Sequence, residues 1–411
     1  MPDTTPTTEL SGWRRYLGLP QNVLALSAVS LLNDTSSEII YPLLPAFLAL
    51  SLGASPFAIG LIEGFAESTA SLLKLFSGYL SDKFSNRKLP VFAGYALAAV
   101  TRPFLAFVTS WPQVLIVRMT DRAGKGIRGA PRDALLADSV PENERGLAFG
   151  FNRASDHMGA VLGPIVAFLM LWAFAADKSH PTVGEYERVF LFASIPVVFG
   201  LLVIAFFVRE KHPGEHHDAG EVKFSLRGYD ANFKRFLVTI ALFTLSNSTD
   251  AFLLLRATDA GIAPVLLPLL WVVLHISKVV FSLIGGSLSD KLGRKALIIA
   301  GWTVYALVYA GFAFVTTAWQ CWVLFVIYGV YFGLSEGVEK AFVADMVPRT
   351  KRGTAFGLYN LAFGITVFPA SLLFGWVWYA VGASTAFIAS AVVSFAAIGL
   401  LATVRSKKTS V

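Results

Sequence analysis

Charged residues are scarce in this sequence: Asp, Glu, Lys and Arg together make up 15% of the 411 residues. Soluble globular proteins carry about 25%, so the composition argues against a water-soluble enzyme of two or three domains. Hydrophobic residues make up 55% of the chain. The bilayer is therefore the expected solvent.

Cysteine and the motifs of enzymes are also scarce. Cys321 is the only cysteine, which excludes an internal disulfide. The first twenty residues lack the pattern of a cleavable signal peptide, so we expect insertion through the apolar spans of the chain itself. No metal-ligand spacing and no phosphate-binding loop occurs, and we therefore expect no cofactor, no bound metal and no enzymatic activity. The histidines His212, His216 and His217 are interpreted as a solvated loop cluster.

Twelve apolar runs alternate with charged or turn-rich breaks, and a helix of about 20 residues spans a bilayer. The first set of predicted spans is 22–50, 57–80, 90–110, 113–137, 146–173 and 189–208, and the second set is 235–256, 264–288, 296–316, 320–346, 354–379 and 384–404. The expected fold is an all-α membrane protein with two pseudo-symmetric bundles of six helices. The bundles would occupy residues 1–208 and 235–411, joined by a cytoplasmic loop over 209–234.

Basic residues lie mainly in the loops on one side of these spans. Lys83, Arg145 and Lys351 are examples, whereas the other side has little beyond Lys178, Arg188 and Arg256. By the positive-inside rule the first side is cytoplasmic, so both termini are expected on the cytoplasmic side. The expected location of the protein is the inner membrane of the cell. The net charge of +7 then reflects topology, and no nucleic-acid partner is expected.

Two segments of the first half recur in the second. GYLSDKFSNRKLPV (78–91) returns as GSLSDKLGRKALI (286–298), and ADSVPENERGLAFGFN (137–152) returns as ADMVPRTKRGTAFGLY (344–359). The two offsets are 208 and 207 residues, which indicates an internal duplication. Parallel repeats are one plan of secondary transporters, with the substrate path between the repeats near the membrane midplane.

The repeated loop resembles the signature that the major facilitator superfamily has between helices 2 and 3 and between helices 8 and 9. Its residues are Gly78, Leu80, Asp82, Arg87 and Lys88 in the first copy and Gly286, Leu288, Asp290, Arg294 and Lys295 in the second. The first copy departs from the family pattern because Ser85 and Asn86 replace a single glycine. The resemblance covers essentially the whole chain. It implies a cytoplasmic gate formed by Asp82, Arg87, Asp290 and Arg294.

Two further signatures are similar to those of particular branches of this superfamily. Arg122, Gly126 and Ala130 resemble the Arg-x-x-x-Gly signature of proton-coupled antiporters, with Lys125 and Arg128 replacing a usual Gln and Gly. Gly159, Gly163 and Pro164 resemble the Gly-x-x-x-Gly-Pro signature of exporters, with Ala167 and Phe168 replacing its closing glycines. Glycines four residues apart permit close helix contact and proline bends a span, so these three residues are also gating candidates. Packing by small residues alone is the alternative.

Basic residues form a stripe along the span 113–137, at steps of three or four: Arg118, Arg122, Lys125, Arg128 and Arg132. Such a stripe is costly against lipid, so it should face a cavity, a cytoplasmic opening or acidic partners. We interpret Arg118, Arg122 and Lys125 as sites that attract anionic substrate groups. The alternative for the last two residues of the stripe is that they extend to the cytoplasmic surface.

Other ionisable or polar side chains also fall inside predicted spans, where they are typical of transport pathways. The predicted central cavity contains Asn33, Asp34, Glu38, Arg118, Arg122, Lys125, Asn152, Asn247, Asp250, His275, Lys278 and Glu336. The candidates for carrying a coupling proton are Asp34, Glu38, Asp156 and His157. The alternative is a set of permanent ion pairs that brace helices, for which Glu63, Glu67, and Glu339 beside Lys340 are the foremost candidates.

The repeat also aligns opposite charges, because Arg132 matches Glu339 at an offset of 207 residues. We expect either a salt bridge that closes the cytoplasmic side or a cavity with a dipole.

The expected function is secondary active transport by alternating access, with proton-coupled export of a small amphipathic or anionic organic solute. One alternative is an importer, by symport or facilitated diffusion, of an organic anion or a metal chelate such as a siderophore. A membrane receptor or scaffold without flux is another. The expected partners are the small-molecule substrate, protons and the lipid bilayer, and the expected oligomeric state is a monomer.

Overall fold

The structure, a computed structural model, describes residues 18–83, 86–141, 144–210, 226–348 and 351–405, and the described part is helical without strands. Ten of its helical segments are long and apolar enough to cross a membrane. This confirms an all-α, multi-pass membrane protein. The predicted spans 57–80 and 113–137 also form long helices, α4 and α6, which are not among these ten and carry much of the charge described below.

The helices follow the order of the predicted spans. The first half of the chain forms α2 (Gln21–Ile40), α3 (Leu44–Ala46), the π-helical turn η1 (Phe47–Ser51), α4 (Pro56–Lys83), α5 (Lys88–Thr101), the 3-10 helix η2 (Arg102–Phe107), α6 (Trp111–Asp138), α7 (Arg145–Phe174) and α8 (Val183–Phe207). The second half forms α9 (Ala231–Ser246), α10 (Ala251–Asp259), the 3-10 helix η4 (Pro264–Leu266), α11 (Leu267–Leu292), α12 (Arg294–Ala313), α13 (Ala318–Met346), α14 (Arg352–Val381) and α15 (Ala383–Thr403). We call these two sets the N-terminal and C-terminal helices.

Helix starts repeat between the two halves, as the sequence does. α6 and α13 each begin with a capping box, in which the side chain of Gln113 or Gln320 reaches back to the preceding backbone N–H groups. Thr109 N–H donates to Gln113 at 2.7 Å, and Thr316 N–H donates to Gln320 at 2.8 Å. A capping box satisfies backbone donors that a helix start leaves unpaired. The internal duplication therefore extends to the local hydrogen bonds of the structure.

α9 begins earlier than the sequence indicated. The Asp230 carboxylate accepts a hydrogen bond from the backbone N–H of Phe233 at 2.8 Å, so the helix starts at Ala231, inside the predicted loop 209–234. An aspartate at this position stabilises a helix start.

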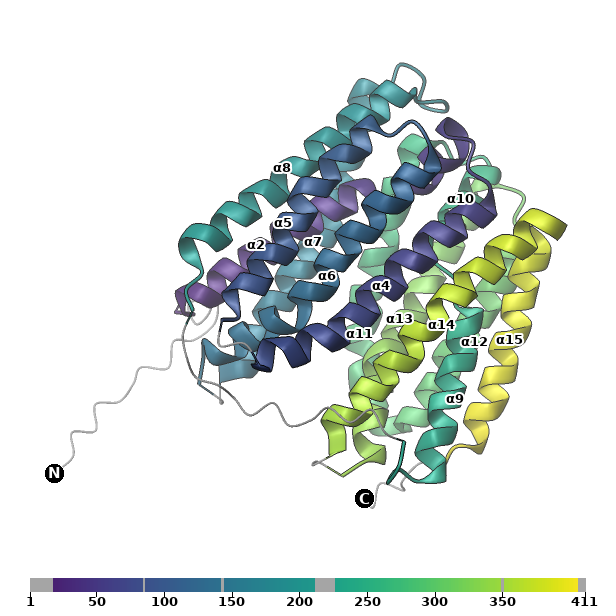
Figure 1. Ribbon diagram of the computed structural model, residues 1–411. Helices are drawn as coiled ribbons and strands as arrows, with labels where there is room; N and C mark the ends of the chain where they lie inside the picture. Colours follow the sequence, from purple (N-terminus) through teal and green to yellow (C-terminus); the bar gives the residue numbers. More distant parts are fainter. Residues whose placement is uncertain (1–17, 84–85, 142–143, 211–225, 349–350, 406–411) are drawn as a thin grey trace.

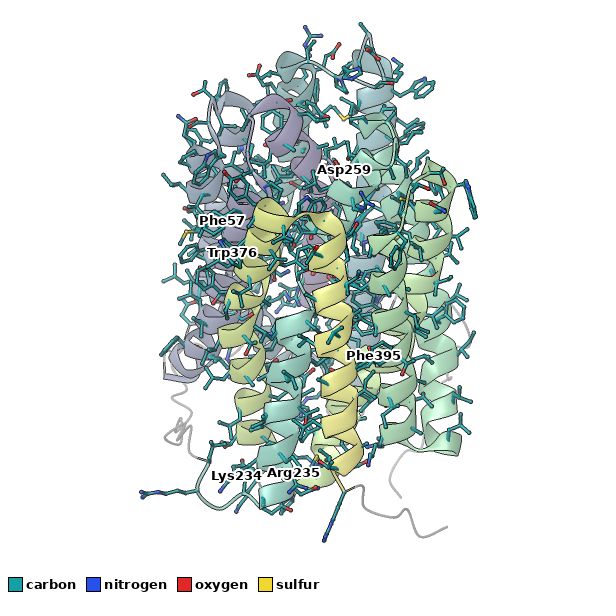
Figure 2. All side chains as sticks on the ribbon, turned by 90° about the vertical axis from the view of Figure 1, so that its right-hand side faces the viewer. Phe57, Lys234, Arg235, Asp259, Trp376 and Phe395 are labelled. Atoms are coloured by element: carbon teal, nitrogen blue, oxygen red, sulfur yellow. The ribbon has the colours of Figure 1, made fainter. Side chains whose placement is uncertain are left out.

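The two ends of the molecule differ in charge. Lys234 and Arg235 lie at one end, and Asp259 lies toward the other (Figure 2). We call them the basic end and the opposite end. Phe57, Trp376 and Phe395 are exposed on the outer surface between the ends, as expected for side chains that face lipid.

Contacts between the two sets of helices run mainly through two helix pairs. α4 packs against α14, and α7 packs against α11. In Figure 1, α4 and α14 run side by side, with most N-terminal helices on one side of them and most C-terminal helices on the other. Within each set, α2 packs on α7 and α8, and α11 packs on α13. The surface where the two sets meet is where a substrate path between repeats would lie.

Candidate functional site

α4 and α14 are in close contact from the opposite end to the middle of α4. An added Cβ at Gly60 would lie 2.3 Å from the backbone oxygen of Ser371, so the two backbones touch at this glycine. Deeper along α4, the rings of Phe65 and Phe368 lie 4.4 Å apart, and the Ser68 hydroxyl donates to the Gly364 carbonyl at 2.9 Å. The two sets of helices are therefore closed against each other on this side.

α2 and the C-terminal helices meet near the middle of the molecule through polar side chains. The Trp271 indole N–H donates to the Glu38 carboxylate at 2.8 Å, and His275 lies 4.0 Å from the same carboxylate. The Tyr41 hydroxyl lies 3.5 Å from the Thr249 hydroxyl. Glu38 and His275, both predicted cavity residues, are thus brought together from opposite halves of the chain.

The predicted span 235–256 is interrupted between α9 and α10. Residues 247–250 leave the helical path in a run of Ser, Asn, Thr and Asp, whose side chains compete with helical hydrogen bonding. Asn247 donates to the Tyr331 hydroxyl at 3.0 Å, and Tyr328 donates to the Asp250 carboxylate at 2.7 Å. Lys278 lies 4.0 Å from Asp250. The structure thereby joins three predicted cavity residues, Asn247, Asp250 and Lys278, around this break.

Two cations of the α6 stripe are paired with acids of α4. Arg118 forms a bidentate ion pair with Glu63, with N–O distances of 2.7–3.0 Å, and both residues are buried. Arg122 lies 3.4 Å from Glu67. The guanidinium group of Arg118 is therefore held inside the N-terminal helices, in an ion pair that braces α4 against α6.

Arg128 and Arg132, the two residues of the stripe nearest the basic end, also have partners. Arg128 donates to the Gly94 carbonyl at 3.2 Å and lies over the Tyr95 ring at 4.3 Å. Arg132 donates to Asp133 at 3.0 Å and lies 3.9 Å from Asp156, a predicted proton carrier. Neither residue extends to the surface as the alternative interpretation held, because each finds partners inside the protein.

Lys125 is the exception in this stripe. The side chain is exposed, and no hydrogen-bond or ion-pair partner lies within reach among the described residues. Ile116, which is 66% exposed, lies nine residues earlier, or two and a half turns, and so on the opposite face of α6. α6 packs against α4 and also contacts α2. Lys125 lies seven residues, or nearly two turns, after Arg118, and so on the same face of α6 as the side chain that pairs with Glu63 of α4. The side chain therefore points toward α2 and α4, on the inner face of α6.

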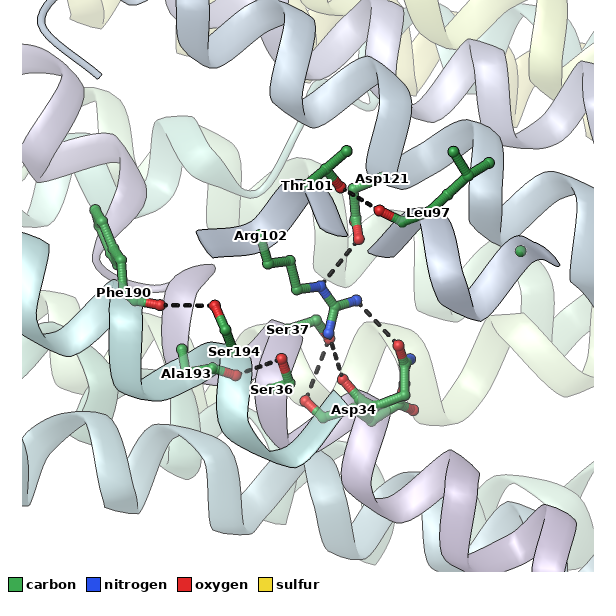
Figure 3. A network of polar contacts seen from close by, with 12 residues as sticks. Asp34, Ser36, Ser37, Leu97, Thr101, Arg102, Asp121, Phe190, Ala193 and Ser194 are labelled. Carbon is green, nitrogen blue, oxygen red and sulfur yellow. Dashed lines mark hydrogen bonds and ion pairs between the residues drawn. The ribbon is translucent and has the colours of Figure 1, made fainter. Parts of the chain in front are cut away.

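Arg102 is a buried cation that sequence reasoning overlooked. It lies at the start of η2 and donates to Asp121 at 2.9 Å and to the backbone and side-chain oxygens of Asn33 at 3.0 Å each, as Figure 3 shows for the guanidinium group and Asp121. Asn33 in turn donates to Asp34 at 2.9 Å. An arginine inside an apolar run was the available indication. Asn33, a predicted cavity residue, is buried within this network.

The remaining predicted residues of α7 fall into two groups. Asn152 donates to the Ser30 hydroxyl at 3.2 Å and is buried against α2. Gly159 and Gly163 touch α2, since an added Cβ at either would lie 2.7 Å from a backbone oxygen of that helix. Pro164 is buried next to them. These three gating candidates hold α7 against α2 within the N-terminal helices.

A cavity of about 460 Å³ lies nearer the basic end, between α7 and the C-terminal helices. Its lining includes His157, Arg153 and Arg294 together with Glu336 and Lys340 of α13. Glu336 lies 3.5 Å from Arg153 and 3.7 Å from Lys340, so one carboxylate connects α7 with α13 across the cavity. His157 and Glu336, both predicted site residues, are brought together here.

The predicted gate residues Arg87 and Arg294 occupy equivalent positions in the two halves. Arg87 pairs with Asp138, and Arg294 pairs with Asp345. Both partners belong to the second repeated segment, so the two ion pairs are related by the duplication. The side chains of Asp82 and Asp290 lie outside the described residues.

The partners of Glu339 differ from those expected. It does not pair with Lys340, which lies beside Glu336 instead. Its carboxylate accepts hydrogen bonds from Trp302 and Tyr359, and it forms no salt bridge with Arg132. Adjacent residues of a helix do not face each other, which explains why the expected brace is absent.

Residues 333–337 match the letters of a hydrolase nucleophile turn, Gly-x-Ser-x-Gly, but lie inside α13. Ser335 is buried and donates to the Tyr331 carbonyl at 2.7 Å. The pattern therefore serves helix packing at this place.

A model of the Major Facilitator Superfamily matches residues 26–335 and 235–411. The chain belongs to the major facilitator superfamily. An MFS-type transporter of Methanocaldococcus jannaschii is 35% identical over 366 residues, covering 88% of this chain and 89% of that protein. The multi-drug resistance efflux pump PmrA of Streptococcus pneumoniae is 29% identical over 347 residues, covering 81% of this chain and 83% of the pump. The signature loops, the paired arginines and the duplicated capping boxes are thus features of a superfamily member.

Solved structures show the same fold at low sequence identity. The nucleoside transporter NupG superposes with a TM-score of 0.79 at 15% identity, covering 93% of this chain and 100% of the transporter. A D-xylose-proton symporter superposes with a TM-score of 0.74 at 17% identity, covering 95% of this chain and 98% of the symporter. This superfamily transports solutes, and its fold serves many unrelated substrates.

Proposed function

We propose that this superfamily member is a proton-coupled exporter of a small amphipathic or anionic organic solute. Residues 1–208 and 235–411 would form two six-helix bundles that open their shared surface alternately to each side of the inner membrane. The basic end would face the cytoplasm, with both termini there, according to the positive-inside rule.

Lys125 is the observation that carries the proposal. It is a cation inside a membrane helix, exposed on the inner face of α6 and without a partner among the described residues. An unpaired intramembrane charge is costly unless it faces a cavity or a ligand. Arg118, by contrast, already forms an ion pair with Glu63. Anion recognition therefore falls to Lys125, with Arg122 next to it.

Acidic and histidine side chains of α2 and α7 supply the proposed coupling. Asp34 and Glu38 lie on α2, which contacts α6, the helix of Lys125. One oxygen of Asp156 is buried without a hydrogen bond, and His157 lines the cavity near the basic end. An anionic solute at Lys125 would change the electrostatic cost of ionising these groups, which is the minimum that coupling requires.

Two observations favour export as the direction. The Gly159, Gly163 and Pro164 signature resembles that of exporters, and PmrA, a relative along most of this chain, is named as an efflux pump. Uptake of an organic anion or a metal chelate remains the competing direction, and a receptor without flux is the competing class.

A ligand panel on the purified protein tests the anion site. A ligand that binds the folded state raises its thermal stability, so we expect anionic compounds to raise the unfolding temperature and Lys125→Ala to abolish that rise while leaving the effect of neutral ligands. Lys125→Arg should restore part of it. Lys234→Ala is the matched control, because Lys234 is an exposed lysine at the basic end. Equal losses for anionic and neutral ligands would contradict the assignment.

Transport in vesicles with the basic end outward tests direction and coupling. An anionic ligand from the panel, added outside, should enter the lumen while protons leave, so a lumenal pH dye should report alkalinisation. Acidification of the lumen together with ligand entry would indicate symport. Flux that ignores an imposed pH gradient would exclude proton coupling, and binding without flux would favour the receptor.

A further inference from the structure

Glu339 is a carboxylate held by two neutral donors. The residue lies on α13 and is 8% exposed. The Trp302 indole of α12 donates to Oε1 at 2.8 Å, and the Tyr359 hydroxyl of α14 donates to Oε2 at 2.7 Å. The ring of Phe243 from α9 stacks on Trp302 at 3.9 Å and closes this side of the site. Three helices thus surround one acidic group.

No basic partner accompanies this carboxylate in the part of the chain that the structure describes. Among the described residues, no Lys, Arg or His lies within ion-pair distance of Glu339. Glu336 and Lys340, the charged neighbours on α13, pair with each other at 3.7 Å. Trp302 and Tyr359, the polar groups from α12 and α14, are neutral. An ionised carboxylate in such a place is expensive, and protonation is the direct way to remove its charge.

Two other acids that are buried among the described residues, Glu63 and Asp121, have arginine partners. Glu63 is paired with Arg118 at 2.7 Å, and Asp121 is paired with Arg102 at 2.9 Å. The repeat places Arg132 opposite Glu339 in sequence alignment, and Arg132 has Asp133 at 3.0 Å. Glu339 therefore stands apart from the braces of the N-terminal helices.

The two donors fit both protonation states. Trp302 can only donate, so Oε1 accepts a hydrogen bond whether or not the group is ionised. A tyrosine hydroxyl can donate or accept. When a proton binds Oε2, that oxygen can donate to the Tyr359 oxygen, and the hydroxyl hydrogen of Tyr359, which is only partly buried, can turn toward water. Both carboxyl oxygens thus keep a hydrogen bond in either state.

We propose that Glu339 reversibly binds a proton at Oε2 and that this site takes part in coupling. Proton binding adds one H⁺ from water to the carboxylate and breaks no covalent bond. The Tyr359 contact links the site to α14, the helix that also packs against α4 of the other half. A change at Glu339 therefore acts on a helix at the surface where the two halves separate. The coupling role, unlike proton binding itself, rests on the function proposed above.

Infrared difference spectroscopy of the purified protein in lipid tests proton binding without any substrate. The wild type should show the carbonyl stretch of a protonated carboxylic acid at low pH and lose it at high pH. Glu339→Gln, which keeps the size of the side chain, should lack the component of this band that Glu339 contributes, while the components of the other carboxylates remain. Glu336→Gln is the matched control on the same helix, and its spectrum should retain the Glu339 component.

A band unchanged in Glu339→Gln would overturn the proposal. If that variant does not fold, Tyr359→Phe provides the second measurement, because loss of the hydroxyl must shift the band frequency and its pH midpoint when the band arises from Glu339. An unshifted band in Tyr359→Phe would overturn the proposal as well.

Transport then separates the coupling role from the proposed function. With a ligand that the wild type moves, Glu339→Gln should retain ligand exchange at equal pH on both sides and lose accumulation driven by a pH gradient. Gradient-driven accumulation at the wild-type level would overturn the coupling role. Absence of flux in the wild type would instead refute the proposed transport, while the infrared result would still decide proton binding.

Discussion

Gly60 offers a test of which side of the molecule is closed. A Cβ at this position would lie 2.3 Å from the Ser371 oxygen of α14, nearer than real Cβ atoms approach a backbone atom. In Gly60→Ala, α4 and α14 must therefore move apart at the opposite end. Overpacking of this kind costs about 1–3 kcal/mol. If that cost falls on the closed state alone, the ratio of open to closed molecules rises about 5- to 150-fold.

Cysteine labelling measures this shift. The one native cysteine, Cys321, is buried, so a Thr249→Cys reporter can be read against a low background. Thr249 is 9% exposed and lies 3.5 Å from Tyr41 of the other half, so opening should uncover it. In vesicles with the opposite end outward, a membrane-impermeant maleimide should label the reporter faster when Gly60→Ala is present.

Gly399→Ala is the matched control, because a Cβ there would meet no atom within 4 Å. It should leave the labelling rate unchanged. If Gly60→Ala folds with normal thermal stability and labels no faster than Gly399→Ala, the contact between α4 and α14 does not govern opening, and the reasoning fails.

Three further predictions concern ion pairs and the broken helix. Arg118→Leu should lower the free energy of unfolding by about 3–5 kcal/mol, because Glu63 is left as a buried charge without a partner. In thermal unfolding, the double variant with Glu63→Leu should recover most of that loss. Equal losses in the single and double variants would show that the pair does not brace α4 against α6. Arg87→Ala and Arg294→Ala should each slow transport while ligand binding stays measurable, since each ion pair lies at the basic end and away from Lys125; lost binding in a folded variant would count against a gate. Tyr328→Phe should weaken ligand binding or transport less than Asp250→Asn, because Lys278 still faces the carboxylate, and the reverse order would assign the main role to the hydroxyl.

The spans and the repeat were predictable because their physical origin is local. Apolar runs long enough to cross a bilayer mark the helices, and polar interruptions mark their ends. The break after Ser246 also had a local indication, a run of residues that favour non-helical hydrogen bonds, yet the span 235–256 was predicted as continuous. The segments on both sides of the break are apolar, so the apolar pattern alone predicts one continuous span.

The partner of each intramembrane charge was not predictable in the same way. The partners of Glu339 are Trp302, 37 residues before it, and Tyr359, 20 residues after it. Both lie on other helices, so the spacing of residues along one helix does not predict either contact. Arg118 and Glu63 could be placed on neighbouring helices, but only the packing of α4 on α6 brings them into a bidentate pair. The packing of the helices determines whether an intramembrane charge is paired or free. The sequence pattern indicates only which residues are candidates.

The acids that pair with arginines in the N-terminal helices and Glu339 in the C-terminal helices are satisfied by different means, and this bears on coupling. In the N-terminal helices, arginines meet carboxylates, which leaves Lys125 as the exposed cation of the α6 stripe. In the C-terminal helices, Glu339 is satisfied by Trp302 and Tyr359 instead. The proposed anion site and the proposed proton site thus lie on different halves and do not compete for one residue. Two separate sites influence each other when each prefers one arrangement of the halves. In the proposed cycle the halves separate at the surface between α4 and α14, so solute and proton would communicate through this surface.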